Sequence, residues 1–169
     1  MTERADALKL VLRAAEFAAR KHKDQRRKDA DASPYVNHPI ALARILSEEG
    51  GVDDPVVLAA ALLHDTIEDT ETSYQELRGE FGVAVADVVA EVTDTKWIQK
   101  STRKQIQISR AAKSSHGAKL VKIADKIANL RDIIASPPAA WTIARKRRSS
   151  PTRSTVAFVQ SSRRRAGSQ

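Results

Sequence analysis

The chain has 169 residues, a formal net charge of +8 and no cysteine. This length suits one compact domain with its own hydrophobic core, and no apolar run is long enough to cross a membrane, so we expect a cytoplasmic protein. Without cysteine, disulfide bonds and thiolate metal sites are excluded, and a bound metal would need nitrogen and oxygen ligands.

The N-terminal part of the chain is predicted to form a helix followed by a charged loop. Apolar residues recur at helical spacing from Thr2 to about Lys23, which indicates an amphipathic helix. The loop over residues 24–35 is rich in lysine, arginine and aspartate, and Pro34 restricts the chain near its end. We expect this loop to form the rim of an active site, with at most a small β-hairpin near residues 28–36.

The rest of the body is predicted to be helical. One helix covers residues 39–49 and stops at two glycines. The next begins at Asp54-Pro55, since aspartate accepts hydrogen bonds from free amides and proline fits the first helical position, and it runs to about Asp69. Residues 56–63 are apolar nearly all round, which is typical of a helix buried on most sides. Helices over residues 73–82, 83–92, 102–112 and 117–134 complete an all-α fold.

Two potential metal ligands, His64 and Asp65, follow the apolar stretch directly. A His-Asp pair alone is more often a buried hydrogen-bonded pair without a metal. Two further residues favour the metal here: His38 stands at a helix entrance, and Asp125 follows a second, mostly apolar stretch. A cation would offset the cost of burying these groups. Two histidines and two aspartates suit Mn²⁺, Fe²⁺ or Zn²⁺, and we expect manganese first.

Two more acids, Glu68 and Asp69, follow one helical turn later. Because residues four apart are stacked on a helix, they share a face with His64 and Asp65. The predicted metal pair therefore has two carboxylates beside it that are not expected to ligate the metal.

The order His, His-Asp and a distant Asp is similar to the signature of the HD superfamily of phosphohydrolases. The chain most resembles its RelA/SpoT hydrolase branch, and within it the small stand-alone alarmone hydrolases of the metazoan SpoT homologue type. The resemblance covers about residues 8–145 and is carried by the segments 17–22, 25–29, 34–39, 60–70, 91–94 and 118–132.

This resemblance implies an HD-domain helical bundle over residues 1–145 that uses Mn²⁺. The implied reaction removes the 3′-pyrophosphate of guanosine 3′,5′-bis(diphosphate) (ppGpp), giving GDP and pyrophosphate. The resemblance implies that the metal ligands are His38, His64, Asp65 and Asp125. It implies a catalytic acidic pair, Glu68 and Asp69, which could orient or deprotonate a water whose pKa the metal lowers. The implied substrate contacts are Arg27, Lys28, Lys100, Asn129 and Arg145.

The end of the chain departs from the family pattern. Residues 137–169 contain eight basic residues and no acid, which equals the whole net charge of +8. Where relatives have an acidic and aromatic helix with a substrate-contacting tyrosine, this chain is rich in serine and arginine. Such a composition is typical of a poorly ordered segment. Our hypothesis is that residues 146–169 form a frameshifted or otherwise divergent tail, which removes one wall of the substrate pocket.

Three functions are compatible with the sequence. The first is ppGpp hydrolysis, and the second is hydrolysis of the 2′-phosphate of NADPH or of another nucleotide phosphate. The third is a catalytically impaired nucleotide- or nucleic-acid-binding protein whose basic tail supplies the affinity by neutralising phosphates. We expect a small-molecule nucleotide as the partner, and neither a membrane nor a nucleic acid. The sequence does not fix the oligomeric state.

Overall fold

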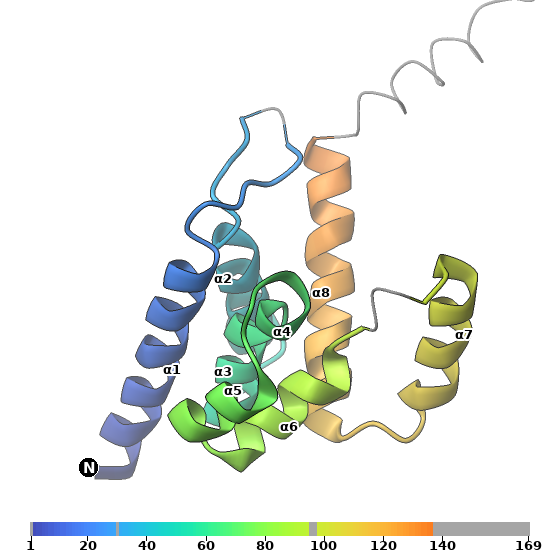
Figure 1. Cartoon of the computed structure of the whole chain (residues 1–169). Coiled ribbons are helices and arrows are strands. Elements are labelled where there is room, and N and C mark those ends of the chain that lie inside the picture. Colours follow the sequence, from blue (N-terminus) through green and yellow to red (C-terminus); the bar gives the residue numbers. More distant parts are fainter. Residues whose placement is uncertain (1, 30, 95–97, 137–169) are drawn as a thin grey trace, which may run out of the picture.

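The computed structural model describes residues 2–29, 31–94 and 98–136 (Figure 1). These ranges are helical and contain no strand, so the predicted all-α fold is confirmed. The predicted tail over residues 146–169 lies outside the described residues. None of the described helices has the length and apolarity that crossing a bilayer requires.

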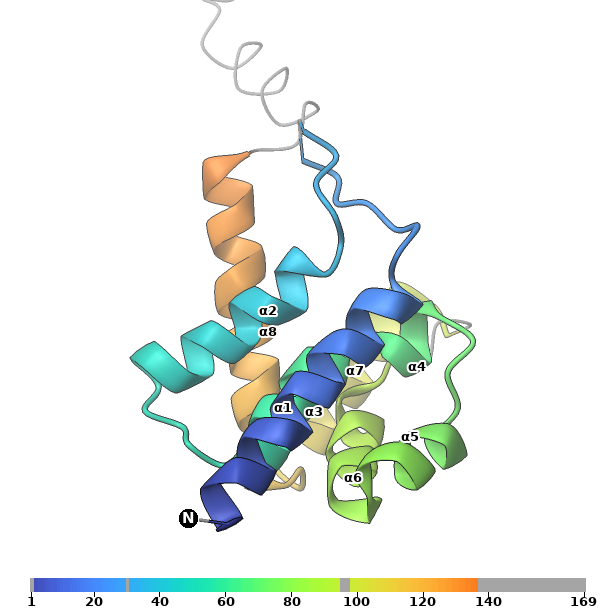
Figure 2. The same ribbon diagram turned by 90° about the vertical axis from the view of Figure 1, so that its left-hand side faces the viewer.

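One central helix, α3 (Pro55–Leu63), organises the bundle. It contacts α1, α2, α6 and α8, and Figure 2 shows α1 running across it while α2 and α8 lie to one side. The other elements, in chain order, are α1 (Thr2–Lys21), α2 (Asn37–Arg44), η1 (Ile45–Glu49), α4 (Thr66–Asp69), α5 (Tyr74–Phe81), α6 (Val83–Val92), α7 (Lys100–Ala111) and α8 (His116–Ala135).

The start of α3 follows directly from its sequence. The Asp54 carboxylate accepts a hydrogen bond from the Val56 amide at 2.8 Å, and Pro55 occupies the first turn, as predicted. From Ala59 to Leu63 every side chain is buried, which matches the apolar circumference of this stretch. Because α3 is enclosed by four other helices, the residues that follow its C-terminal end lie in the interior of the bundle.

The helix predicted from Pro55 to about Asp69 is in fact two helices. α3 ends at Leu63 and α4 begins at Thr66, with Asp65 in a bridging conformation of φ −99° and ψ −6°. The buried Thr66 hydroxyl donates to the Leu63 carbonyl at 2.7 Å and so offers this carbonyl a partner other than a helical amide. The break therefore falls at His64-Asp65, which removes both side chains from the regular helical surface.

The second predicted helix also differs in detail. α2 begins at Asn37, two residues early, and its continuation η1 is a π-helix in which the Gly50 amide donates to the Ile45 carbonyl at 3.0 Å. A Cβ on Gly50 would lie 2.8 Å from the Leu46 carbonyl oxygen, and Gly51 has a positive φ of 63°. Both glycines are thus needed for this helix end.

The charged loop contains one antiparallel bridge, between Arg26 and Pro34, where the sequence predicts at most a small hairpin near residues 28–36. The Arg27 amide donates to the Ser33 carbonyl at 2.9 Å, and the Asp29 carboxylate accepts from the Ser33 amide at 2.9 Å. Ala32 has a positive φ of 48°, which turns the chain sharply and ends the pairing. The loop is thereby held close to the start of α2.

Candidate active site

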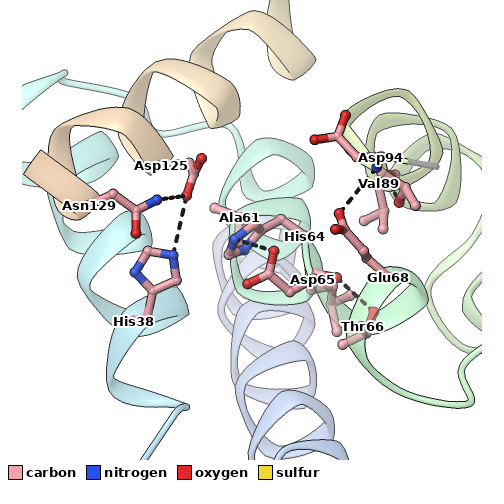
Figure 3. Close-up of polar contacts among 12 residues, drawn as sticks. His38, Ala61, His64, Asp65, Thr66, Glu68, Val89, Asp94, Asp125 and Asn129 are labelled. Atoms are coloured by element: carbon pink, nitrogen blue, oxygen red, sulfur yellow. Dashed lines mark hydrogen bonds and ion pairs between the residues drawn. The ribbon is translucent and has the colours of Figure 1, made fainter. Parts of the chain in front are cut away.

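The four predicted metal ligands converge from three separate parts of the chain (Figure 3). His38 lies at the start of α2, His64 and Asp65 in the break between α3 and α4, and Asp125 in the middle of α8. His38 Nε2 is 3.3 Å from Asp125 Oδ1, and the centres of the His38 and His64 rings are 5.4 Å apart. Ligand atoms of His38, His64 and Asp65 lie within 4.8 Å of one another. One ion could therefore reach His38, His64 and Asp65, and Asp125 lies next to this group through its contact with His38.

The tautomer of His64 shows why this site suits a cation. His64 Nδ1 lies 2.9 Å from the Ala61 carbonyl, which can only accept a hydrogen bond, so Nδ1 carries the proton. The lone pair of Nε2 then faces Asp65 Oδ1 at 2.7 Å, and this buried nitrogen has no hydrogen-bond partner among the described residues. Two acceptors at this distance repel each other unless a proton or a metal ion is shared between them. The donor set therefore fits a divalent metal.

The charges around the site keep both aspartates ionised. Burial opposes a charge on His64, but the attraction of Asp65 and then of Asp125 raises the pKa of this imidazole. Burial alone would raise the pKa of Asp65, yet the contact with His64 lowers it. The pKa of Asp125 is lowered in the same way, against burial, by His38 and by Lys126 at 2.8 Å. Ionised carboxylates of this kind are the state that binds a metal.

The predicted catalytic acids lie on α4, next to the metal residues. Glu68 is half-buried, and its Oε2 accepts a hydrogen bond from the Asp94 amide at 3.2 Å. Burial raises the pKa of Glu68, and the negative charges of Asp94, Asp69 and Asp65 add to this effect against the amide hydrogen bond. The backbone carbonyl of Asp69 accepts from Gln25 Nε2 at 2.7 Å. A carboxylate with a raised pKa is suited to exchanging protons with a substrate or water.

These groups line one polar cavity of about 230 Å³. Two of the predicted substrate residues, Arg27 and Asn129, line it as well. Asn129 Nδ2 donates to Asp125 Oδ1 at 2.5 Å, and Arg27 forms an ion pair with Asp132 at the rim. The cavity therefore combines a carboxylate-rich floor with cationic and amide donors at its edge.

Three predicted substrate residues are not placed in this cavity. Lys28 is exposed and does not line it. Lys100 is the first residue of α7, but its side chain lies outside the described structure. Arg145 also lies outside the described residues. The roles of all three stay predictions.

The cavity also includes residues to which the sequence analysis assigned no role. Spacing could have identified Lys122, because it precedes Asp125 by three residues and so shares a helical face with it. Tyr35 lies in the turn before α2, where helical spacing gives no signal. Lys122 Nζ lies 3.5 Å from the Asp94 carboxylate across the cavity. The additional polar lining residues are Tyr35, Asp94, Lys122 and Lys126.

The comparison with protein families and curated sequences agrees with this geometry. The family model described as "HD domain" matches residues 14–149. A Homo sapiens protein named guanosine-3′,5′-bis(diphosphate) 3′-pyrophosphohydrolase MESH1 is 55% identical over 132 residues, which cover 78% of this chain and 74% of that protein. The Drosophila melanogaster protein of the same name is 50% identical over 131 residues, covering 78% of this chain and 73% of that protein.

Solved structures give the same result. One, described as a metazoan ortholog of SpoT that hydrolyses ppGpp, superimposes with a TM-score of 0.75 and 47% identity, covering 82% of this chain and 78% of that one. A Listeria monocytogenes protein superimposes with a TM-score of 0.54 and 37% identity, covering 60% of this chain and 64% of that one. The resemblance identified in the sequence is confirmed, and the chain belongs to the HD domain family, in the branch that contains the metazoan SpoT-related hydrolases.

Proposed function

We propose that this chain is a Mn²⁺-dependent hydrolase that removes the 3′-pyrophosphate of ppGpp, giving GDP and pyrophosphate. The observation that carries the proposal is the cavity in which two histidines and two aspartates converge beside a second pair of carboxylates. Relatives about half identical to the chain, such as the human protein, are named for this reaction.

The proposed metal ligands are His38, His64, Asp65 and Asp125. Imidazole and carboxylate groups together suit Mn²⁺, Fe²⁺ or Zn²⁺, and we propose Mn²⁺ as the working ion. A divalent metal held there would supply a Lewis acid that lowers the pKa of water and offsets phosphate charge. The protein contributes a pre-formed, largely buried set of donors, since the exposed fractions of the His38 and His64 side chains are 3% and 7%.

Glu68 is the proposed general base. Its raised pKa and its position on the cavity wall allow it to take a proton from the water that attacks the phosphorus next to the ribose 3′-oxygen. The bond between that phosphorus and the 3′-oxygen breaks, and the departing oxygen takes up a proton. Asp69, on the same helical turn, is proposed to orient the water. The products are then GDP and pyrophosphate, which balances the addition of one water.

The negative charge of the substrate is proposed to be bound at the rim. Arg27, Lys122 and Lys126 line the cavity and carry positive charge, and each is paired with a carboxylate that phosphate oxygens could replace. Asn129 offers an amide to the sugar or phosphate. Lys28, Lys100 and Arg145 are further proposed contacts.

The decisive experiment measures product identity. The metal-stripped protein is supplied with Mn²⁺, Fe²⁺ or Zn²⁺ and incubated with ppGpp or with NADPH, while pyrophosphate and orthophosphate are quantified separately. We expect pyrophosphate and GDP in equal amounts from ppGpp, with loss of turnover in His64→Ala and Glu68→Ala. Glu80→Gln is the matched control, since Glu80 is an exposed residue paired with Arg13 outside the cavity.

Other outcomes select the other functions. Orthophosphate from NADPH without turnover of ppGpp would replace the proposed substrate, and no turnover with any metal would refute the proposed hydrolase. A binding protein that depends on the basic tail would lose nucleotide or nucleic-acid affinity on deletion of residues 146–169, with a steep salt dependence in the intact chain. A cytoplasmic location stays a prediction, which cell fractionation tests.

A further inference from the structure

Tyr35 connects the metal residues with the substrate-side rim. Its hydroxyl donates a hydrogen bond to Asp65 Oδ2. Its ring packs against the buried His22, with ring centres 4.9 Å apart, and lies 6.0 Å from the ring of His38. On the rim side, the Arg27 guanidinium lies over the Tyr35 ring at 5.7 Å. This one side chain thus contacts groups with two different proposed tasks.

The backbone holds Tyr35 firmly in this place. Its amide donates to the Gln25 carbonyl at 3.1 Å, and its carbonyl accepts from the His38 amide at 2.9 Å. Gln25 is itself fixed, because its side chain contacts His22 Nδ1 at 2.8 Å and donates to the Asp69 carbonyl at 2.7 Å. The direction of the Tyr35 hydroxyl is therefore set by the packing of α1, α2 and α4 rather than by the ligand.

This contact makes the two oxygens of Asp65 unequal as potential metal ligands. Oδ2 is occupied by the Tyr35 hydroxyl, whereas Oδ1 faces His64 Nε2 at 2.7 Å. A carboxylate that uses both oxygens takes up two coordination positions on a metal. Because Oδ2 already accepts a hydrogen bond, it is the weaker donor to a metal, and ligation through Oδ1 alone is favoured. Single-oxygen ligation leaves another coordination position for water or a phosphate oxygen.

We infer that Tyr35 is a positioning residue that restricts Asp65 to single-oxygen ligation of the metal. The inference rests on the proposed function, because it concerns the metal site of that reaction. Partners of this kind, which orient a ligand without touching the metal, typically contribute 10–100-fold to metal affinity or activity. Tyr35 acts through Asp65, so its hydroxyl should affect metal binding and turnover, while its ring supports Arg27.

The chain offers a matched pair of variants. Tyr35→Phe removes the hydroxyl and keeps the ring with its contacts to His22 and Arg27, so folding should be preserved. Tyr74→Phe removes the same atom from a second tyrosine whose hydroxyl donates to Asp87 at 2.6 Å. Tyr74 does not line the metal cavity. The difference between the two variants isolates the effect of the bond to Asp65.

The test measures Mn²⁺ affinity of the metal-free proteins by the electron paramagnetic resonance signal of free Mn²⁺, together with kcat and KM for ppGpp. For Tyr35→Phe we expect Mn²⁺ binding about 10–100-fold weaker, kcat lowered at saturating Mn²⁺, and KM changed less than about threefold. Tyr74→Phe should match the wild type, and neither variant should shift the melting temperature of the metal-free protein appreciably.

Wild-type Mn²⁺ affinity and kcat in Tyr35→Phe would overturn the inference. A rise in KM with unchanged metal affinity would also overturn it, because the residue would then act on the substrate alone. If the wild type hydrolyses neither ppGpp nor NADPH, the proposed function fails, but the comparison of Mn²⁺ affinities still decides the role of Tyr35.

Discussion

The break between α3 and α4 depends on one buried hydroxyl, and its removal gives a specific prediction. Thr66 is fully buried, and its Oγ1 donates to the Leu63 carbonyl at 2.7 Å. In Thr66→Val the side-chain shape is kept but the donor is lost, which leaves the carbonyl without this partner in the interior. Leaving a buried polar group unsatisfied costs about 1–3 kcal/mol of unfolding free energy.

This cost should appear in both stability and metal binding. For a domain of this size, a loss of 1 kcal/mol of unfolding free energy lowers the melting temperature by about 2–4 °C. The melting temperature of the metal-free variant should therefore fall by about 2–12 °C. Because His64 and Asp65 lie within the turn that this bond closes, Mn²⁺ affinity should fall as well. Urea unfolding followed by circular dichroism gives the free energy, and the Mn²⁺ titration described above gives the affinity.

The control is Thr93→Val. Thr93 Oγ1 also donates to a backbone carbonyl at 2.7 Å, that of Val89, but the residue is only half-buried and lies outside the metal cavity. Water can donate to the Val89 carbonyl in place of the lost hydroxyl, so the loss of unfolding free energy should be smaller than in Thr66→Val. The Mn²⁺ affinity should be unchanged. If the unfolding free energy of Thr66→Val stayed within about 0.5 kcal/mol of the wild-type value, the Thr66 hydroxyl would not stabilise the turn as we predict.

Three further predictions follow from the site. Glu68→Gln should lower kcat by about 10²–10⁴-fold with Mn²⁺ affinity retained, as measured by steady-state kinetics and metal titration; loss of metal binding would instead make Glu68 a ligand. Because the pKa of Glu68 is raised above its ordinary 4.5 and the base must be ionised, kcat should decline as the pH falls through a value above 4.5, and this limb should vanish in Glu68→Gln. Metal removal should abolish turnover and lower the melting temperature, because Mn²⁺ at about 100 times its Kd stabilises the folded state by about 2.7 kcal/mol. An unchanged melting temperature would contradict binding of Mn²⁺ to the folded state.

Sequence patterns predict where a helix begins when a capping side chain marks its first turn. α3 begins at Asp54-Pro55 as predicted, because the Asp54 carboxylate satisfies a free amide. The helix predicted from residue 73 is α5, and the Ser73 hydroxyl accepts a hydrogen bond from the Glu76 amide at its start. The break after Leu63 was missed. It depends on a buried hydroxyl bonding a carbonyl, and threonine at such a position gives no distinct signal in an apolar, helix-forming stretch.

The sequence predicts most residues of the candidate site but not the contacts between them. His38 stands out at a helix entrance, His64 and Asp125 each follow an apolar stretch, and the family resemblance links the three residues. The bond from Tyr35 to Asp65 joins residues 30 positions apart, and the contact between Lys122 and Asp94 spans 28 positions. Such contacts depend on how helices pack, which periodicity within one helix does not encode.

The central claim is that one divalent ion is held by two histidines and two aspartates. It is tested most directly by a crystal structure of the Mn²⁺-loaded protein, with anomalous diffraction measured at the manganese edge. We predict one anomalous peak, with His38, His64, Asp65 and Asp125 each contributing one coordinating atom. A peak elsewhere, or a peak that Asp125 or His38 does not reach, would contradict the account.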